Sequence, residues 1–401
     1  MPAEHLFAQA RAIAPRITAL RRAIHAEPEL GLETPLTLAK ARAELADLPL
    51  EWRQGTACTG AVAVLKGARA GRTVLLRGDM DALPMQEETG LAFASAIPGR
   101  MHACGHDTHT AMLAGAARLL AAQREALAGE VRFMFQPGEE GFHGARFMID
   151  DGLLGGDDSP LPDAVFALHI MPNYRHGALV GRTGTLLAAA DKLEIVVEGR
   201  GGHASMPHQT RDPVPVACEI VTALQALVTR RYDATEATVV TVTQLDAGSA
   251  HNVIPDRAVL KGTIRTLSAE RRQVVRDDLR RLAEGIAAAH ECRAQVVVID
   301  GFPPTINDPR AVDLLEAVAC GLPDGSFERL AQPIMGAEDF SYVLERIPGA
   351  MALLGVAAEG SDYASCCGIH SSRMVVDEAA LPRGAAILAG CALRFLERGW
   401  Q

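Results

Sequence analysis

The chain has 401 residues, of which 48% are hydrophobic and 22% charged, and its formal net charge is −10. This balance is typical of a globular protein and excludes a disordered chain. An acidic chain without a Lys/Arg-rich stripe repels phosphate backbones, so nucleic acid is not an expected partner. The length exceeds what one hydrophobic core usually organises, which predicts two domains.

The sequence gives no sign of export or of membrane insertion. Several arginines interrupt the first 30 residues, and no apolar run there has the length of a signal-peptide core. Nowhere do about 18 uncharged apolar residues occur together, which argues against a spanning helix. The eight cysteines are thinly spread, unlike a disulfide framework. We therefore expect a cytoplasmic protein without a membrane partner.

Helical and strand-like segments alternate through the first 185 residues. Helical spacing of apolar residues occurs at 6–24, 35–48 and 108–123, and apolar runs typical of buried strands at 61–65, 73–76, 131–135 and 165–170. This alternation predicts an α/β fold with a mostly parallel sheet that helices cover on both faces.

The order of elements changes after Thr185. Strand-like segments at 192–197, 237–245, 258–266 and 295–299 combine with helical segments at 214–230 and 269–289. This βαββαβ order predicts a ferredoxin-like unit, inserted at 186–300. Residues 1–185 and 301–401 would form the core domain, the latter with helices at 308–320, 337–346 and 377–398 and a strand at 350–354.

The segment 101–109, Met-His-Ala-Cys-Gly-His-Asp-Thr-His, holds the densest cluster of potential metal ligands. A metal site needs several N, S or O donors that converge on one point. Cys104 and His106 can supply two together, because Gly105 between them allows backbone angles that other residues avoid. Alone, such a segment is more often a His-rich surface loop with one buried cysteine. The donors elsewhere in the chain favour the metal site.

Glu139 and Glu140 follow the apolar run 131–135 and lie between glycines. If this segment is extended, the two carboxylates point in opposite directions. Glu140 could then bind a metal while Glu139 acts as a general base on a water molecule. A solvated glutamate pair in a turn is the commoner alternative for such a pair in isolation.

Other donors stand at predicted strand ends or in glycine-containing loops: His169, Asp79 with Asp81, and His370. Taken singly, His169 is as often a core histidine, and His370 is uninformative. Because a doubly wound sheet brings its strand exits together, we expect these residues to meet in space.

The inserted domain carries its own polar residues. Residues 199–204 match a weak dinucleotide-binding pattern, but Pro207 and Pro213 exclude the helix that such a site requires. Asn252 lies in a predicted loop. Arg265 lies in a predicted strand, where it is either paired or solvated, or a clamp for a substrate carboxylate. Motifs of zincins, serine hydrolases and P-loop proteins are absent from the sequence.

Several motifs, in the same order, resemble those of the metallo-aminoacylases and exopeptidases that include hippurate hydrolase and the auxin-conjugate hydrolases. They span nearly the whole chain, at 78–84, 101–110, 136–141, 201–208, 252–255, 262–265 and 335–340. The resemblance implies two divalent ions, with zinc expected and Mn, Co or Ni as alternatives, since a cysteine ligand favours thiophilic ions. The implied ligands are Cys104, His106, Glu140, His169 and His370.

The resemblance also implies roles outside the ligand set. Glu139 would be the general base, and Asp81 a carboxylate that orients a ligand. The inserted domain 186–300 would be a lid or dimerisation domain. In it, His203 would stabilise the oxyanion, and Arg265 and Asn252 would bind the substrate, with His208 a weaker candidate. Because some of these residues reach across a dimer interface in relatives, we expect a homodimer or higher homo-oligomer.

The expected activity is hydrolysis of the amide bond of N-acyl amino acids. A metallo-dipeptidase or carboxypeptidase of the same family is one alternative. A non-catalytic metal-binding protein is another, although a storage site needs no base such as Glu139. One departure from the family concerns the substrate pocket: Ser372 stands where many relatives have proline, and residues 374–376 lack the usual aromatic.

Overall fold

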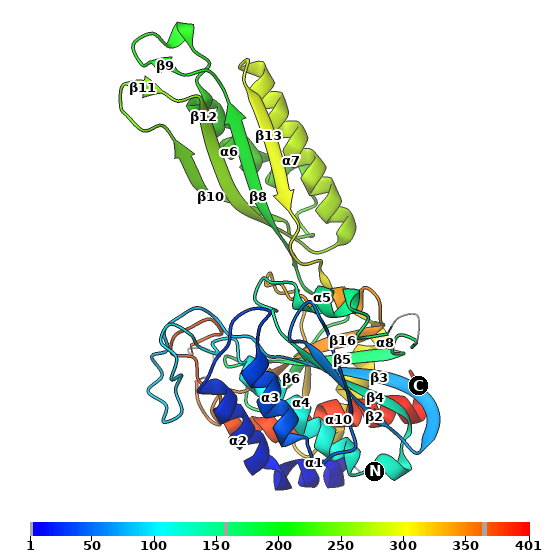
Figure 1. Cartoon of the computed structure of the whole chain (residues 1–401). Helices are drawn as coiled ribbons and strands as arrows, with labels where there is room; N and C mark the ends of the chain where they lie inside the picture. Colours follow the sequence, from blue (N-terminus) through cyan, green and yellow to red (C-terminus); the bar gives the residue numbers. More distant parts are fainter. Residues whose placement is uncertain (1–2, 156–158, 363–366) are drawn as a thin grey trace. The chain divides into compact units, whose positions relative to one another are not determined.

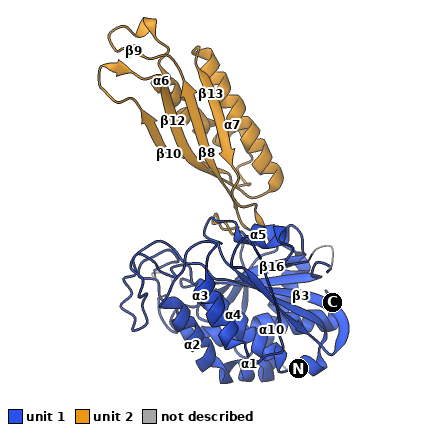
Figure 2. Ribbon diagram, viewed as in Figure 1, with its two compact units in different colours: residues 1–186, 306–332, 339–401 blue, residues 187–305, 333–338 orange. Residues whose placement is uncertain are grey.

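The computed structural model describes residues 3–155, 159–362 and 367–401. The chain divides into two compact units, each with its own hydrophobic core (Figures 1 and 2). Unit 1 comprises residues 1–186, 306–332 and 339–401. Unit 2 comprises residues 187–305 and 333–338.

Unit 1 is built on an eight-stranded sheet with the order β1-β2-β4-β3-β5-β16-β6-β15. The strands are β1 (Glu51–Gln54), β2 (Ala61–Lys66), β3 (Arg69–Asp79), β4 (Ala128–Gln136), β5 (Ala164–Met171), β6 (Leu179–Gly181), β15 (Phe327–Arg329) and β16 (Gly349–Gly355). The central strands β4, β3, β5 and β16 are parallel, and antiparallel pairs occur toward both edges. The predicted α/β class with a mostly parallel sheet is confirmed.

The helices of unit 1 are α1 (Ala3–Ala12), α2 (Ala14–His25), α3 (Pro35–Glu44), α4 (His106–Ala121), α5 (Gly144–Asp150), α8 (Pro309–Gly321), α9 (Ser341–Leu344) and α10 (Leu381–Arg398). α4 and α10 pack on each other and on the central strands β3 and β5. The stretch Glu378–Arg398 is long and apolar enough to cross a membrane by composition, but most of it is buried inside the protein. Its burial is that of a core helix.

Three predicted helices are wrong in extent. The helix expected at 35–48 ends at Glu44. The helix expected at 6–24 is broken into α1 and α2, because Pro15 at the start of α2 lacks the N–H that a continuous helix needs. The helix expected at 337–346 is reduced to Ser341–Leu344. There the Asp339 carboxylate is committed to buried hydrogen bonds from Gln136 and from the backbone N–H of Ala145.

Unit 2 has a four-stranded sheet with the order β10-β12-β8-β13, which α6 and α7 cover. In chain order these are β8 (Ala189–Glu198), α6 (Pro213–Arg231), β10 (Val239–Ala247), β12 (Arg257–Thr266), α7 (Ala269–Ala289) and β13 (Arg293–Ile299). This is the βαββαβ order of a ferredoxin-like unit. Unit 2 also contains the short pair β9 (Gly202–His203) with β11 (Val253–Ile254). Another short pair, β7 (Gly184–Leu187) with β14 (Thr305–Asn307), lies where the chain passes between the two units.

The segment 333–338 groups with unit 2, whereas the sequence pattern placed it in the core domain. The reason is a local pairing: the backbone N–H of Ala188 donates to the carbonyls of Ile334 and Gly336.

Candidate metal centre

Neighbouring strands and loops of unit 1 converge on one cluster of potential metal ligands. Cys104 precedes α4, and His106 begins it. Glu140 follows β4, His169 lies in β5, and His370 lies in the loop before α10. The ligand atom of Cys104 lies within 4.8 Å of those of the other four. The structure therefore brings together all five residues that the sequence suggested as ligands.

Gly105 makes the approach of Cys104 and His106 possible. Its φ of +82° lies in the left-handed region, and a Cβ at this position would come within 2.5 Å of the Ile170 side chain. Only glycine fits both conditions. The predicted need for an unusual backbone angle between the two donors is confirmed.

The donors face one another at short range. Cys104 Sγ lies 3.3 Å from His169 Nε2, and His370 Nε2 lies 3.4 Å from Glu140 Oε1. Among the described residues, neither ring nitrogen of buried His106 has a hydrogen-bond partner, nor has Glu140 Oε1. Buried polar atoms are normally paired, so these orphaned atoms fit a site whose partner is a cation.

The electrostatics of the cluster also favour a cation. Burial opposes protonation of His106, yet Asp79 and Cys104 raise its pKa well above the usual value. The neighbouring side chains of Cys104 and Glu140 raise the pKa of His370 to about 10. These protons neutralise an excess of negative charge, and a metal that binds here would displace them.

Glu139 and Glu140 lie in a turn, so the expectation of an extended segment is wrong. The backbone N–H groups of the two glutamates donate to different oxygens of Asp81, each at 3.0 Å. These two hydrogen bonds fix the turn, and both glutamate carboxylates then face the region around His106. With His106 they form a group whose ligand atoms all lie within 4.8 Å of one another.

Asp81 holds a central place in this arrangement. Besides receiving both glutamate N–H groups, its Oδ1 lies 3.4 Å from His106 Nδ1. A carboxylate behind one ring nitrogen directs the other nitrogen toward a metal. This geometry is the one that the predicted orienting role of Asp81 requires.

Asp79 and His109 form a further close group with His106. Asp79 was among the carboxylates expected at this strand exit, whereas no separate role was predicted for His109. The signal for His109 was its position three residues after His106, on the same helix face. His102, in contrast, belongs to none of the metal-ligand groups found among the described residues. Burial lowers its pKa to about 3.

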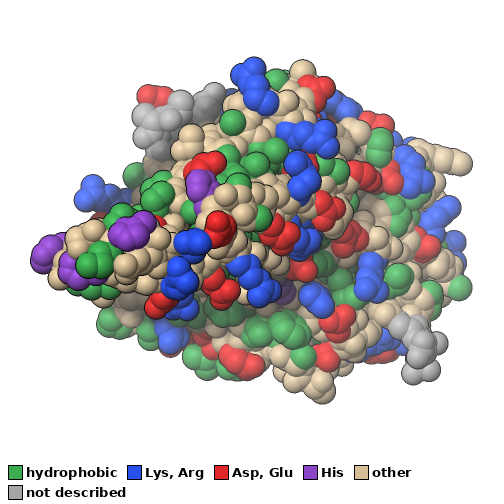
Figure 3. All heavy atoms as spheres, turned by 90° about the horizontal axis from the view of Figure 1, so that it is seen from above, with side chains coloured by type: hydrophobic (Ala, Val, Ile, Leu, Met, Phe, Trp, Pro, Cys, Tyr) green, Lys and Arg blue, Asp and Glu red, His purple; other side chains and the backbone are tan. Residues whose placement is uncertain are grey.

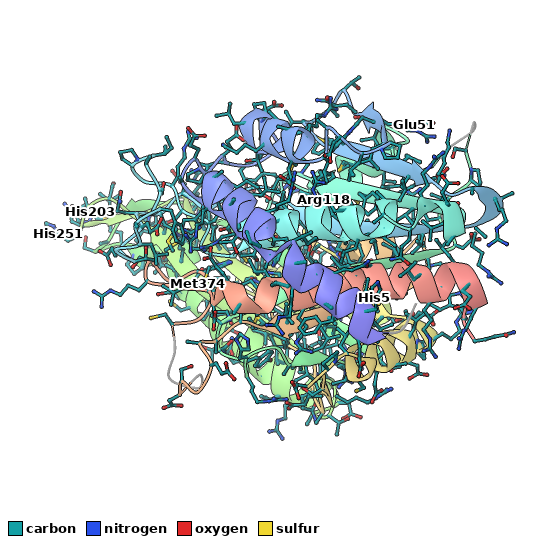
Figure 4. All side chains as sticks on the ribbon, turned by 90° about the horizontal axis from the view of Figure 1, so that it is seen from below. His5, Glu51, Arg118, His203, His251 and Met374 are labelled. Atoms are coloured by element: carbon teal, nitrogen blue, oxygen red, sulfur yellow. The ribbon has the colours of Figure 1, made fainter. Side chains whose placement is uncertain are left out.

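The remaining predicted residues lie in unit 2. His203 in β9 is paired with Val253 in β11, and the N–H of Ala204 donates to the Asn252 carbonyl. His203, His208 and His251 are all exposed. Histidine side chains gather at one end of the face in Figure 3, and His203 and His251 lie close together in Figure 4.

Arg265 lies at the opposite end of unit 2. It is paired with Ala190 at the start of β8, whereas Arg257 is paired with Glu198 at its end, four residues before β9. The eight positions between Arg257 and Arg265 on β12 correspond to about 26 Å of extended strand. The structure therefore brings His203 and Asn252 together, but not with Arg265.

Known proteins resemble this chain over almost its full length. The model of peptidase family M20/M25/M40 matches residues 75–394. The chain belongs to this family. Thermostable carboxypeptidase 1 of Saccharolobus solfataricus is 37% identical over 98% of both chains. N-acetylcysteine deacetylase of Bacillus subtilis is 37% identical over 95% of this chain and 97% of its own.

A solved structure shares both sequence and fold. The Bacillus subtilis YXEP protein, described as a dinuclear metal-binding peptidase of the M20 family, superposes with a TM-score of 0.84. It is 35% identical to this chain, with 97% of this chain and 99% of that one covered. The predicted family and the predicted reaction class, metal-dependent amide hydrolysis, are confirmed.

Proposed function

We propose that this enzyme hydrolyses the amide bond of N-acyl amino acids with two divalent cations. The observation that carries the proposal is that two ligand groups share Cys104, one with His106 and His169 and the other with Glu140 and His370. Thiolate, imidazole and carboxylate donors suit zinc, with Mn, Co or Ni as alternatives.

Glu139 is the general base in this proposal. Divalent ions bound here would polarise the amide carbonyl and lower the pKa of a water molecule. The Glu139 side chain is buried beside His106, and its backbone is fixed by Asp81. From this position it takes the proton of the attacking water and passes it to the leaving amine.

His203 has the tautomer that oxyanion stabilisation requires. The backbone N–H of Ser205 donates to His203 Nδ1 at 3.1 Å, so a neutral ring carries its proton on Nε2. This leaves an exposed N–H donor for the tetrahedral oxyanion. Such donors are typically worth about 3–4 kcal/mol in the transition state.

Arg265 is suited to bind the carboxylate of the substrate. It is half-buried, and within the part of the chain that the structure describes its guanidinium forms no hydrogen bond or ion pair. Burial lowers its pKa, an effect that Asp191 partly opposes. A carboxylate would supply the missing partner in a bidentate geometry, and Asn252 would add amide hydrogen bonds.

The distance between Arg265 and His203 supports a homodimer. Arg265 lies about 26 Å along β12 from Arg257, which pairs with the end of β8 that leads to His203, so Arg265 and His203 of one copy cannot both contact one small substrate. We infer that one is supplied by a second copy. The exposed apolar side chains Met206 and Val253, close to His203 in the chain and in the β9–β11 pair, suit burial against that copy.

We further propose that the enzyme acts in the cytoplasm, with a small-molecule substrate and without nucleic acid or membrane as partner. The net charge of −10 supports the absence of nucleic acid binding. The burial of Glu378–Arg398 supports the absence of a membrane partner.

The variant Glu139→Gln tests the proposal, with N-acetyl and N-benzoyl amino acids as substrates after reconstitution with metal. We expect both ions to be retained, because Glu139 is not a ligand, and kcat to fall by about 10²–10⁴-fold. Metal analysis and steady-state kinetics check this. Near-normal turnover by the variant would remove Glu139 as the base.

A carboxypeptidase or dipeptidase activity is the second candidate, favoured by the similarity to thermostable carboxypeptidase 1. Dipeptides and N-blocked peptides belong in the same assay. A kcat/KM for them that exceeds the value for every N-acyl amino acid would favour this alternative. Bound metal without turnover of either class would indicate a non-catalytic protein.

A further inference from the structure

A buried chain of polar groups lies directly beside the proposed ligands. Asp79, His106 and His109 have potential ligand atoms within 4.8 Å of one another, close enough to hold one metal ion. All three side chains are buried completely or almost completely. The hydrogen bonds of the His109 ring show whether His109 can be a metal ligand.

Both ring nitrogens of His109 are engaged. The backbone N–H of Ile170 donates to His109 Nε2 at 2.9 Å, so this nitrogen has no free lone pair. The proton of the neutral ring must then be on Nδ1, which lies 2.6 Å from Asp79 Oδ1 and donates to it. His109 therefore has no lone pair left for a metal.

Asp79 is fixed as an anion at the other end of this interaction. Its Oδ2 lies 2.7 Å from Arg77 Nη1 in a fully buried ion pair. Arg77 also donates to Gln136 and Asp339, and these hydrogen bonds hold its guanidinium next to Asp79. A buried anion held in this way keeps the donor of His109 directed toward it.

The backbone of Ile170 contacts both His109 and His169. The Ile170 carbonyl accepts the N–H of His169 Nδ1 at 2.7 Å, which leaves His169 Nε2 directed at Cys104. The interactions thus run from Arg77 through Asp79 and His109 to Ile170, and from Ile170 to the ring of His169. An outer hydrogen bond of this kind sets the tautomer and orientation of a metal-binding histidine.

We propose that His109 is a positioning residue, which holds Ile170 so that His169 presents Nε2 to the metal, and that it is not itself a ligand. The inference rests on the proposed function in one respect, that His169 binds metal. It adds that the backbone hydrogen bond to His109 is needed for that binding.

The test compares His109→Leu with His109→Gln in the full-length protein. Leucine leaves the Ile170 N–H unpaired, whereas the side-chain oxygen of glutamine can accept it. His102→Leu is a matched control, because His102 is a buried histidine of the same segment whose ring nitrogens have no hydrogen-bond partner among the described residues. Cobalt titration gives affinity and stoichiometry. Hydrogen exchange of the peptide containing Ile170 is measured without metal.

We expect His109→Leu to bind two cobalt ions per chain with affinity reduced about 10–100-fold, and to exchange faster at Ile170. His109→Gln should recover most of both properties, and His102→Leu should resemble the wild type. Wild-type affinity and exchange in His109→Leu would overturn the proposal. Loss of one ion in both His109 variants would overturn it too, since it would make His109 a ligand.

If the proposed function is wrong, the wild-type enzyme will not hydrolyse N-acyl amino acids. This result does not depend on the His109 variants. The exchange measurement needs neither metal nor substrate and reports on the Ile170 hydrogen bond in either case.

Discussion

At the scale of single residues, the ligand types were predictable, but the role of His109 beside them was not. Cysteine, histidine and glutamate next to glycines at strand exits are a chemical signal that sequence carries directly. The role of His109 depends on which atoms meet each of its nitrogens. Those atoms belong to Asp79 and Ile170, 30 and 61 residues away. Nothing in local sequence spacing specifies such contacts.

A second buried network is equally non-local. Asp107, next to His106, accepts hydrogen bonds from Arg21 at 2.7 Å and His25 at 2.8 Å. The other ring nitrogen of His25 faces Glu87 at 3.2 Å. Burial opposes the charge on His25, but Asp107 and Glu87 raise its pKa to about 9. This network ties the end of α2 to the start of α4.

Deprotonation of His25 should therefore lower the free energy of unfolding at alkaline pH. Because its folded pKa is raised from 6.5 to about 9, its contribution is complete below pH 6.5 and is lost as the pH rises through about 9. At about 1.4 kcal/mol per pKa unit, the contribution is on the order of 3 kcal/mol. Urea unfolding of wild type and His25→Gln at several pH values measures it. A difference between the two proteins that does not shrink between pH 6.5 and 9.5 would contradict this account.

At the scale of elements, regular segments with clear end signals were predictable. The predicted helix 269–289 coincides with α7, where Ser268 caps the helix by accepting the N–H of Arg271. Central strands were found from continuous apolar runs. The strands that were missed, such as β6 and β15, have only three residues each, too few to show a pattern.

The turn at Glu139 and Glu140 shows why the site's local geometry was not predictable. Sequence places these residues after a strand, and continuation of that strand was a reasonable expectation. The Asp81 carboxylate, 58 residues earlier, captures both backbone N–H groups and imposes a turn. A buried tertiary hydrogen bond thus overrides the local preference, and it brings both carboxylates to one region.

At the scale of the whole molecule, the order of elements predicted a βαββαβ unit but not where its polar residues lie. The strand register separates Arg265 from His203, and register follows from the pairing of β8 with β12. The sequence motifs containing these residues gave no indication that they lie at opposite ends of unit 2.

Mixed dimers test whether the two residues come from different copies. Glu139→Gln and His203→Ala should each be inactive alone. If His203 acts on the partner's site, random mixing restores one intact site per heterodimer, about a quarter of wild-type activity per chain. Activity after dissociation and reassociation of the two variants measures this. Mixtures no more active than the separate variants, with heterodimers verified by mass, would place His203 in its own chain's site.

The central claim is that Cys104, the nearby His106 and three distant donors hold a pair of cations. The most direct measurement is anomalous diffraction from crystals of the zinc-reconstituted wild type, with zinc per chain counted independently. We predict two ions per chain, which Cys104, His106, Glu140, His169 and His370 would hold. A single ion at full occupancy, or an ion bound by Asp79 and His109 away from Cys104, would contradict the account.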